Sequence, residues 1–112
     1  MRYKLGDIVL ITFPFVESNT SKNRPALVLL DTDDNDIVAA RITSQLHKDI
    51  YTLEINEWKT CGLLLPSTVK LNKIATINKS YIYFKLGSLQ DTDLAEIRRM
   101  LKEIWCPDKK NI

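Results

Sequence analysis

The chain has 112 residues, of which 45% are hydrophobic and 27% charged, and its formal net charge is +2. This length and composition predict one small globular domain spanning residues 1–112, and the small charge argues against a protein that wraps nucleic acid through bulk charge alone. No apolar run approaches the ~18 residues of a membrane span, and no apolar segment follows Met1 as in a signal peptide. We therefore expect a cytoplasmic protein.

The cysteines and the single histidine form no recognisable metal motif. Cys61 and Cys106 make no Cys-x-x-Cys pair, and the lone His47 cannot complete a zinc site. The acidic run at 31–36 lacks the Gly and the distal Glu of a calcium-binding loop, so we interpret it as a hairpin turn. We predict reduced thiols, no metal site and no cofactor.

Most of the chain has the composition of β-strands. The first three predicted strands, rich in β-branched residues and separated by polar clusters, are 7–13, 24–30 and 36–43, and they predict an antiparallel meander. Four further strands are predicted at 51–55, 67–71, 73–77 and 81–86. Asn78, Lys79 and Ser80 are predicted to form a turn or one short helical turn.

The last segment, residues 90–105, has the period of an amphipathic helix. Its apolar side chains recur at steps of three and four residues, and they are Leu94, Ile97, Leu101, Ile104 and Trp105. Asp91 and Asp93 stand where the helix dipole favours negative charge, and Pro107 ends the helix. We expect this helix to cover the mouth or flank of a small, strongly bent sheet.

One arginine and one threonine stand out as candidate functional residues. Arg24 lies where a polar loop meets an apolar strand, and Thr43 ends the next strand, just before Ser44 and Gln45. In isolation, such an arginine usually extends into solvent or pairs with a carboxylate such as Glu17, and such a threonine usually caps a turn. Because the two strands would pair side by side, the two side chains could also meet at one site.

Short motifs over nearly the whole chain resemble the PemK/MazF family of bacterial toxin–antitoxin systems. They occur in the same order and at compatible spacings: 6–9 (GDIV), 13–15 (FPF), 24–28 (RPALV), 42–45 (ITSQ), 62–63 (GL) with 66–67 (PS) and 69–71 (VKL), 74–76 (IAT), 85–87 (KLG) and 93–97 (DLAEI). The resemblance implies a mostly β fold, a small SH3-like β-barrel with a C-terminal amphipathic α-helix. It also implies a cytoplasmic homodimer that cleaves single-stranded RNA, such as mRNA, without a metal and is held by a cognate antitoxin.

The resemblance assigns catalytic roles to Arg24 and Thr43. In this chemistry the ribose 2′-hydroxyl attacks the adjacent phosphorus, which leaves a 2′,3′-cyclic phosphate and a free 5′-hydroxyl. A guanidinium can hold two phosphate oxygens at once, and a threonine hydroxyl can donate one further hydrogen bond. Some members carry a glutamate five residues before the arginine, where this chain has Asn19, with Glu17 two residues further upstream. The proton acceptor therefore stays open between Glu17, His47, a water molecule and an unusually placed arginine, and Glu17 ranks slightly above His47.

The segment before Arg24 is the predicted RNA-binding loop. Its polar side chains are Ser18, Asn19, Thr20, Ser21, Lys22 and Asn23, and Ser44, Gln45 and His47 follow Thr43 as further candidates. The alternative interpretation of this segment is a mobile hairpin loop with no role in binding. Lys22, Lys48 and Lys73 are candidates for contacts with backbone phosphates, although such lysines are more often solvated surface charges. Trp58 and Tyr81 could stack on bases, but the sequence favours a role in the core or in an interface.

Two other functions fit the same fold. One is a non-catalytic barrel that binds RNA or a protein, and the other is a toxin directed at DNA gyrase. Fold alone does not separate these from a ribonuclease. The discriminating feature is the pair Arg24 and Thr43, because a protein binder has no chemical reason to place them at neighbouring strand ends.

Overall fold

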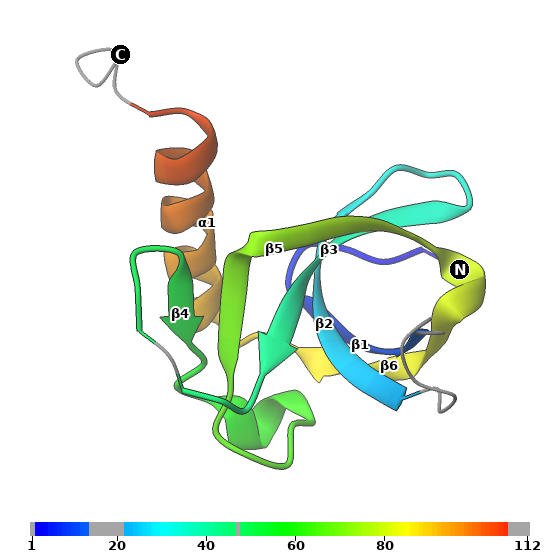
Figure 1. Ribbon diagram of the computed structural model, residues 1–112, viewed down its shortest axis with the longest axis horizontal. Helices are drawn as coiled ribbons and strands as arrows, with labels where there is room; N and C mark the ends of the chain where they lie inside the picture. The colour runs from blue at the N-terminus through cyan, green and yellow to red at the C-terminus, as the bar shows by residue number, and fades with distance from the viewer. Residues whose placement is uncertain (1, 14–21, 47, 108–112) are drawn as a thin grey trace.

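The computed structural model describes residues 2–13, 22–46 and 48–107 (Figure 1). The strands are β1 (Asp7–Phe13), β2 (Lys22–Asp31), β3 (Asp36–Thr43), β4 (Thr52–Glu54), β5 (Thr68–Asn78) and β6 (Ile82–Ser88). Two short 3-10 helices, η1 (Trp58–Cys61) and η2 (Lys79–Tyr81), and one α-helix, α1 (Asp91–Trp105), complete the described elements. The predicted helix and the short helical turn after Asn78 are both confirmed.

All six strands form one antiparallel sheet in the order β4-β5-β3-β2-β1-β6. The first three strands pair as the predicted meander, and the sheet curls strongly on itself (Figure 1). The mostly β, barrel-like fold with a C-terminal helix is therefore confirmed. In the described part of the chain β4 and β6 remain the two edges, so the curled sheet does not close.

The prediction of separate strands at 67–71 and 73–77 was wrong, because one strand, β5, runs through both segments. The register against β3 shifts where Arg41 pairs with Lys70 and the preceding Ala40 pairs with Ile74. The segment lacks Gly and Pro, so nothing in it breaks the strand. Residues 71–73 of β5, which have no Cα partner in β3, are accommodated as an irregularity within the ladder.

Helix η1 was not predicted from the sequence, and two glycines explain its position. Gly62 ends η1 with φ +85°, a conformation that favours glycine. A Cβ atom there would lie 2.2 Å from the carbonyl oxygen of Leu86, and one at Gly87 would lie 2.4 Å from that of Cys61. Because both residues lack a Cβ, the backbone that leaves η1 can lie directly against β6.

The core has two parts, one on each side of the sheet. The first contains Ile8, Ile42 and Val69 together with Ile97 of α1, and the second contains Val9 and other side chains of alternating strand positions. Helix α1 therefore covers one flank of the curved sheet, as expected. Within the described residues, neither α1 nor the two short helices has the length and apolar character that would cross a bilayer.

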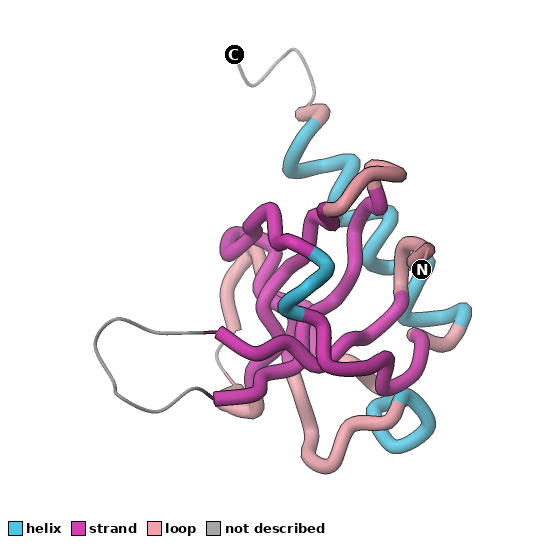
Figure 2. Tube along the Cα trace, turned by 90° about the vertical axis from the view of Figure 1, so that its right-hand side faces the viewer, coloured by secondary structure: helices cyan, strands magenta, loops and turns pink. Residues whose placement is uncertain are grey.

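Two side chains of α1 differ from their predicted settings. Trp105, expected on the apolar face, is 64% exposed, because the end of α1 projects beyond the strands (Figures 1 and 2). Asp93, expected only to complement the helix dipole, is 1% exposed. Its carboxylate accepts hydrogen bonds from the backbone N–H groups of Asn56 (3.2 Å) and Glu57 (3.0 Å), so it ties α1 to the chain before η1.

Candidate functional site

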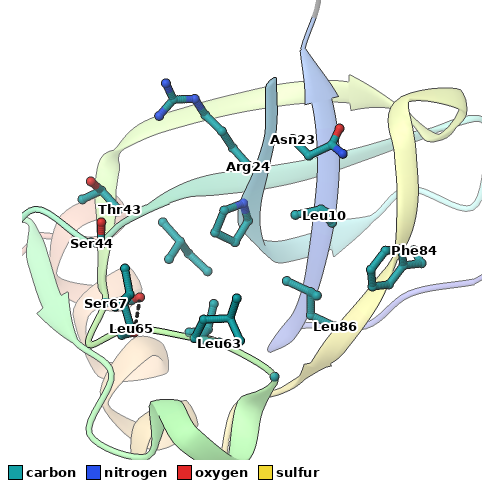
Figure 3. Close-up of a pocket in the computed structure, with 14 residues that line it drawn as sticks. Leu10, Asn23, Arg24, Thr43, Ser44, Leu63, Leu65, Ser67, Phe84 and Leu86 are labelled. Atoms are coloured by element: carbon teal, nitrogen blue, oxygen red, sulfur yellow. Dashed lines mark hydrogen bonds between the residues drawn. The ribbon is translucent and has the colours of Figure 1, made fainter. Parts of the chain in front are cut away.

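A cavity of about 580 Å³ opens where β2 begins and β3 ends (Figure 3). Its polar side chains are Asn23 and Arg24 of β2, Thr43 and Ser44 at the end of β3, and Ser67 before β5. Its apolar wall includes Leu63, Leu64 and Leu65 from the segment after η1, together with Phe84 and Leu86 of β6. The structure therefore brings Arg24 and Thr43 to one cavity.

The register of the β2–β3 hairpin explains why these two residues share a cavity. The ladder between the strands reaches Ala26 opposite Arg41. Carried on by two residues in each strand, the same register sets Arg24 opposite Thr43. Residues two apart in a strand lie on the same face, so both belong to the face of Ala26 and Arg41.

Arg24 stands between two cavities. Its side chain is half-buried, and its Cα pairs with that of Ile11 in β1. In Figure 3 the guanidinium extends away from the apolar wall formed by Leu63 and Leu86. Besides the first cavity, Arg24 lines a second one of about 340 Å³ together with Arg41. A guanidinium is protonated at any physiological pH, so this position carries a fixed positive charge.

Thr43 combines the capping role and the candidate functional role. Its Oγ1 accepts a hydrogen bond of 3.1 Å from the backbone N–H of Gln45, as expected for a threonine that caps a turn. That bond uses an oxygen lone pair, and the hydroxyl proton can still be donated to another group. The Asn23 side chain is also held in place by a hydrogen bond, because its Oδ1 accepts from the Thr12 hydroxyl at 2.6 Å.

The other predicted site residues separate into three groups. Ser44 lines the cavity, whereas the exposed Gln45 does not. Glu17, Ser18, Asn19, Thr20, Ser21, His47 and the side chain of Lys22 lie outside the described residues. Lys48 pairs with Glu54 at 3.6 Å.

The two aromatic residues singled out from the sequence lie away from the first cavity. Trp58 packs against the first part of the core, in line with the core role that the sequence favoured. Tyr81, in η2, is 44% exposed. Neither of them lines the cavity that holds Arg24 and Thr43.

Sequence reasoning missed the apolar wall and two hydroxyl residues. Leu64 is 91% exposed, and the nearby Ser67 donates a 2.8 Å hydrogen bond to the carbonyl of Leu65. Thr68 lies opposite Thr43 and is 1% exposed, and its Oγ1 has no hydrogen-bond partner among the described residues. The signal for the wall was the run of three leucines bracketed by Gly62 and Pro66.

Metal-ligating side chains do not gather at this site. Within residues 2–13, 22–46 and 48–107, no group of three or more His, Cys, Asp or Glu side chains is placed to hold a metal ion. Cys61 and Cys106 are free thiols. Burial raises the pKa of the Cys61 thiol, whose Sγ donates to the carbonyl of Glu57. Cys61 is therefore a core residue.

The same fold occurs in solved structures of low sequence identity. One is an endoribonuclease in complex with its cognate antitoxin from a mycobacterial species, with TM-score 0.77 and 16% identity over 96% of this chain and 99% of that one. Another, a mycobacterial endoribonuclease, has TM-score 0.71 and 16% identity over 92% and 90% of the two chains. The Mycobacterium tuberculosis toxin MazF-mt6 has TM-score 0.73 and 19% identity over 91% and 98%.

Sequence comparison identifies the family. No curated protein sequence matches the chain. The family model for the PemK-like, MazF-like toxin of type II toxin–antitoxin systems matches residues 4–105, which is most of the chain and includes every described element. The chain therefore belongs to the PemK-like, MazF-like toxin family of type II toxin–antitoxin systems.

Proposed function

We propose that this toxin is an endoribonuclease that cleaves single-stranded RNA without a metal and leaves a 2′,3′-cyclic phosphate and a 5′-hydroxyl. Membership of the toxin family supports the proposal, as does the similarity to structures described as endoribonucleases. The observation that carries it is the cavity shared by the Arg24 guanidinium and the Thr43 hydroxyl. A fixed cation and an oriented hydroxyl are the groups that a phosphorane-like transition state requires.

In this mechanism Arg24 and Thr43 act on the non-bridging oxygens of the scissile phosphate. As the 2′-oxygen bonds to phosphorus, negative charge grows on these oxygens, and the two-pronged guanidinium stabilises it. Thr43 adds one hydrogen bond, because the Gln45 N–H already occupies a lone pair of its Oγ1 and leaves the proton to be donated. Neither group is a good base at neutral pH, so we assign removal of the 2′-hydroxyl proton to Glu17, in the segment before β2. The bond between phosphorus and the 5′-oxygen then breaks, and the leaving 5′-oxygen takes up a proton from water to become the 5′-hydroxyl.

Two partners belong to the proposal. We propose that two copies of the chain form a two-fold dimer and that an acidic antitoxin segment competes with RNA for the groove at Arg24. An antitoxin complex of a similar structure supports the second partner. Dimerisation predicts a sedimentation mass twice that of the chain at micromolar concentration. A mass equal to one chain at every concentration tested would refute the dimer.

The central experiment measures cleavage of a single-stranded RNA in EDTA, with analysis of the product ends. Arg24→Ala should lower the rate by about 10²–10³, the loss expected for one preorganised donor, and Arg24→Lys should restore only part of it. The matched control is Arg98→Ala, which removes an exposed arginine of α1. Melting curves should show that all variants fold.

Three outcomes would contradict the proposal. An Arg24→Ala protein that folds and cuts as fast as the Arg98→Ala control would remove Arg24 from the mechanism. Activity abolished by EDTA and restored by a divalent ion would replace the metal-free mechanism. A wild-type protein that cuts no single-stranded RNA would favour a binding function instead.

A further inference from the structure

The first cavity has one ionisable side chain among the described residues that line it, and this side chain is Arg24. Its guanidinium stays protonated at physiological pH, so it does not accept a proton. The other polar side chains of the cavity are neutral amide or hydroxyl groups, and they belong to Asn23, Thr43, Ser44 and Ser67. The described lining residues therefore supply a cation and hydrogen-bond donors but no general base.

Two of the hydroxyl groups are already oriented by hydrogen bonds within the chain. Thr43 Oγ1 accepts from the Gln45 N–H at 3.1 Å, which leaves its proton to be donated. The Ser67 hydroxyl donates its proton to the carbonyl of Leu65 at 2.8 Å. Neutral hydroxyls are weak bases at pH 7 in any case, so neither group is suited to taking a proton from water.

The opposite side of the cavity is apolar. Figure 3 shows the side chains of Leu63 and Leu86 across the cavity from the Arg24 guanidinium. These side chains offer a water molecule neither a hydrogen bond nor a proton acceptor. For a cyclic phosphate to open by hydrolysis, water must take the place of the departed 5′-oxygen and lose a proton. Because the described lining residues provide no base for that step, we expect the cyclic phosphate to persist at the site.

We propose that the protein also catalyses the reverse reaction, in which a 2′,3′-cyclic phosphate end and a 5′-hydroxyl end of one folded RNA are joined. This inference rests on the proposed function and adds a second activity at the same site. The 5′-oxygen loses its proton to water and bonds to phosphorus, and the bond between phosphorus and the 2′-oxygen breaks. The 2′-oxygen regains its proton by the reverse of the removal step proposed above. One phosphate ester replaces another, so the step needs no nucleotide cofactor.

Arg24 and Thr43 serve both directions because cleavage and joining pass through the same transition state. In each direction negative charge grows on the same non-bridging oxygens, which the guanidinium and the hydroxyl stabilise. A catalyst lowers the barrier equally from both sides and leaves the equilibrium unchanged. A substitution at either residue therefore slows joining and cleavage by the same factor.

The fate of the cyclic phosphate depends on whether the 5′-hydroxyl end stays nearby. The two fragments of an unstructured strand diffuse apart, so cleavage of such a strand goes to completion. When the cut lies in the loop of a hairpin, the stem holds both ends together at an effective concentration of about millimolar or more. An attacking group that is also well oriented reacts as if its concentration were ~10⁵–10⁸ M in the best intramolecular cases, far above that of water. Joining should then outpace hydrolysis.

The test uses two RNAs that carry the same cleaved sequence, one in a hairpin loop and one in an unstructured strand. Their halves are synthesised with a 2′,3′-cyclic phosphate and a 5′-hydroxyl at the site that the cleavage experiment identifies. The halves are annealed and incubated with the protein in EDTA, and full-length RNA is measured on a denaturing gel. The variants are Arg24→Ala and Thr43→Val, with Arg98→Ala as the matched control on α1.

Two further controls separate joining from other effects. Halves whose cyclic phosphate has been opened by acid beforehand lack the strained ester and should not join. The affinity of each variant for a single-stranded DNA of the same sequence is also measured. This DNA lacks the 2′-hydroxyl and cannot react, so its affinity distinguishes a loss of binding from a loss of chemistry.

We expect full-length RNA from the hairpin halves and none from the unstructured halves at micromolar concentration. Cleavage of the intact hairpin should accordingly stop short of completion, whereas the unstructured strand should be cut completely. Arg24→Ala should lower kcat/KM for joining by about 10²–10³, and by the same factor for cleavage. Arg98→Ala should join and cut at the wild-type rates.

Three results would overturn the inference. A protein that cuts the intact hairpin but forms no full-length RNA from its halves would lack the joining activity. Opening of the cyclic phosphate faster than joining would show that the site activates water. Loss of cleavage without loss of joining in Arg24→Ala would place the joining activity at another site. A protein that cuts neither RNA would instead refute the proposed function, so the two failures are distinguishable.

Discussion

The two ends of β2 carry opposite charges, and the surroundings of these charges differ. At one end, the Asp31 side chain is 1% exposed and accepts hydrogen bonds from the backbone N–H groups of Tyr3 (2.7 Å) and Asp33 (2.8 Å). It also pairs with Lys79 at 3.0 Å. At the other end, Arg24 faces two cavities, one of which also contains Arg41 and Lys73.

The contrast separates charge that builds the fold from charge that remains available to a ligand. Asp31 is surrounded by donors from three segments of its own chain, so its negative charge is compensated within the protein. Arg41 and Lys70, by contrast, lie opposite each other in the ladder, and neither forms an ion pair with a carboxylate of the described residues. A charged group of the first kind should matter to stability, and one of the second kind to binding.

The sharpest test of this contrast is Asp31→Asn, for which we expect the larger effect. The N–H of Tyr3, followed by Lys79, holds the pKa of Asp31 below its usual value of 3.8. A lowered pKa stabilises the folded protein above the unfolded-state value, and this stabilisation is lost as pH falls through the folded-state value. At pH 7 the substitution should lower the melting temperature by roughly 5–10 °C, and below pH 4 the difference from wild type should shrink.

Melting curves between pH 2.5 and 7 would measure this effect, with DNA binding as the second readout. Asp31 lies at the end of β2 remote from Arg24, so the affinity of the folded variant for single-stranded DNA should match that of wild type. Asp36→Asn, a half-buried carboxylate of β3 outside the Asp31 contacts, serves as the control. Weakened DNA binding by Asp31→Asn at a temperature where the protein is fully folded would break the proposed separation.

A smaller effect is expected at Thr68, which lies opposite Thr43 in the β3–β5 ladder. Its buried hydroxyl has no partner among the described residues, so Thr68→Val removes a poorly solvated polar group and keeps the shape. The free energy of unfolding should rise by about 0–1 kcal/mol. Cleavage should persist in this variant and fall in Thr43→Val, which loses the oriented hydroxyl. Equal loss of cleavage in both would place the Thr68 hydroxyl in the site.

Local pairing made half of the site predictable from sequence. Arg24 and Thr43 belong to two strands joined by the turn at 31–36, so a hairpin suffices to bring them together. Asp93 shows the limit of such reasoning. Its place in the first turn of a helix was evident, but its hydrogen-bond donors lie 36 and 37 residues earlier in the chain. Nothing in the local pattern specified that contact.

The apolar wall of the cavity was not predictable for the same reason. It joins the segment that follows η1 to β6, and their approach depends on Gly62 and Gly87, which lack the Cβ atoms that would clash. The continuity of β5 was missed because the polar Asn72, between the two predicted strands, resembled a break. Tertiary pairing with β3 overrode that local signal.

The pairing of β1 with β6 also has a consequence for the order in which the molecule is made. These are the first and the last described strands in the sequence, yet they are neighbours in the sheet. During synthesis the chain emerges from its N-terminus, so β2 can pair with β1 and with β3 long before β6 is available. Phe84 and Leu86 then complete the cavity last. Pairings this distant in sequence form slowly, so a nascent toxin lacks its finished groove until almost the whole barrel has left the ribosome.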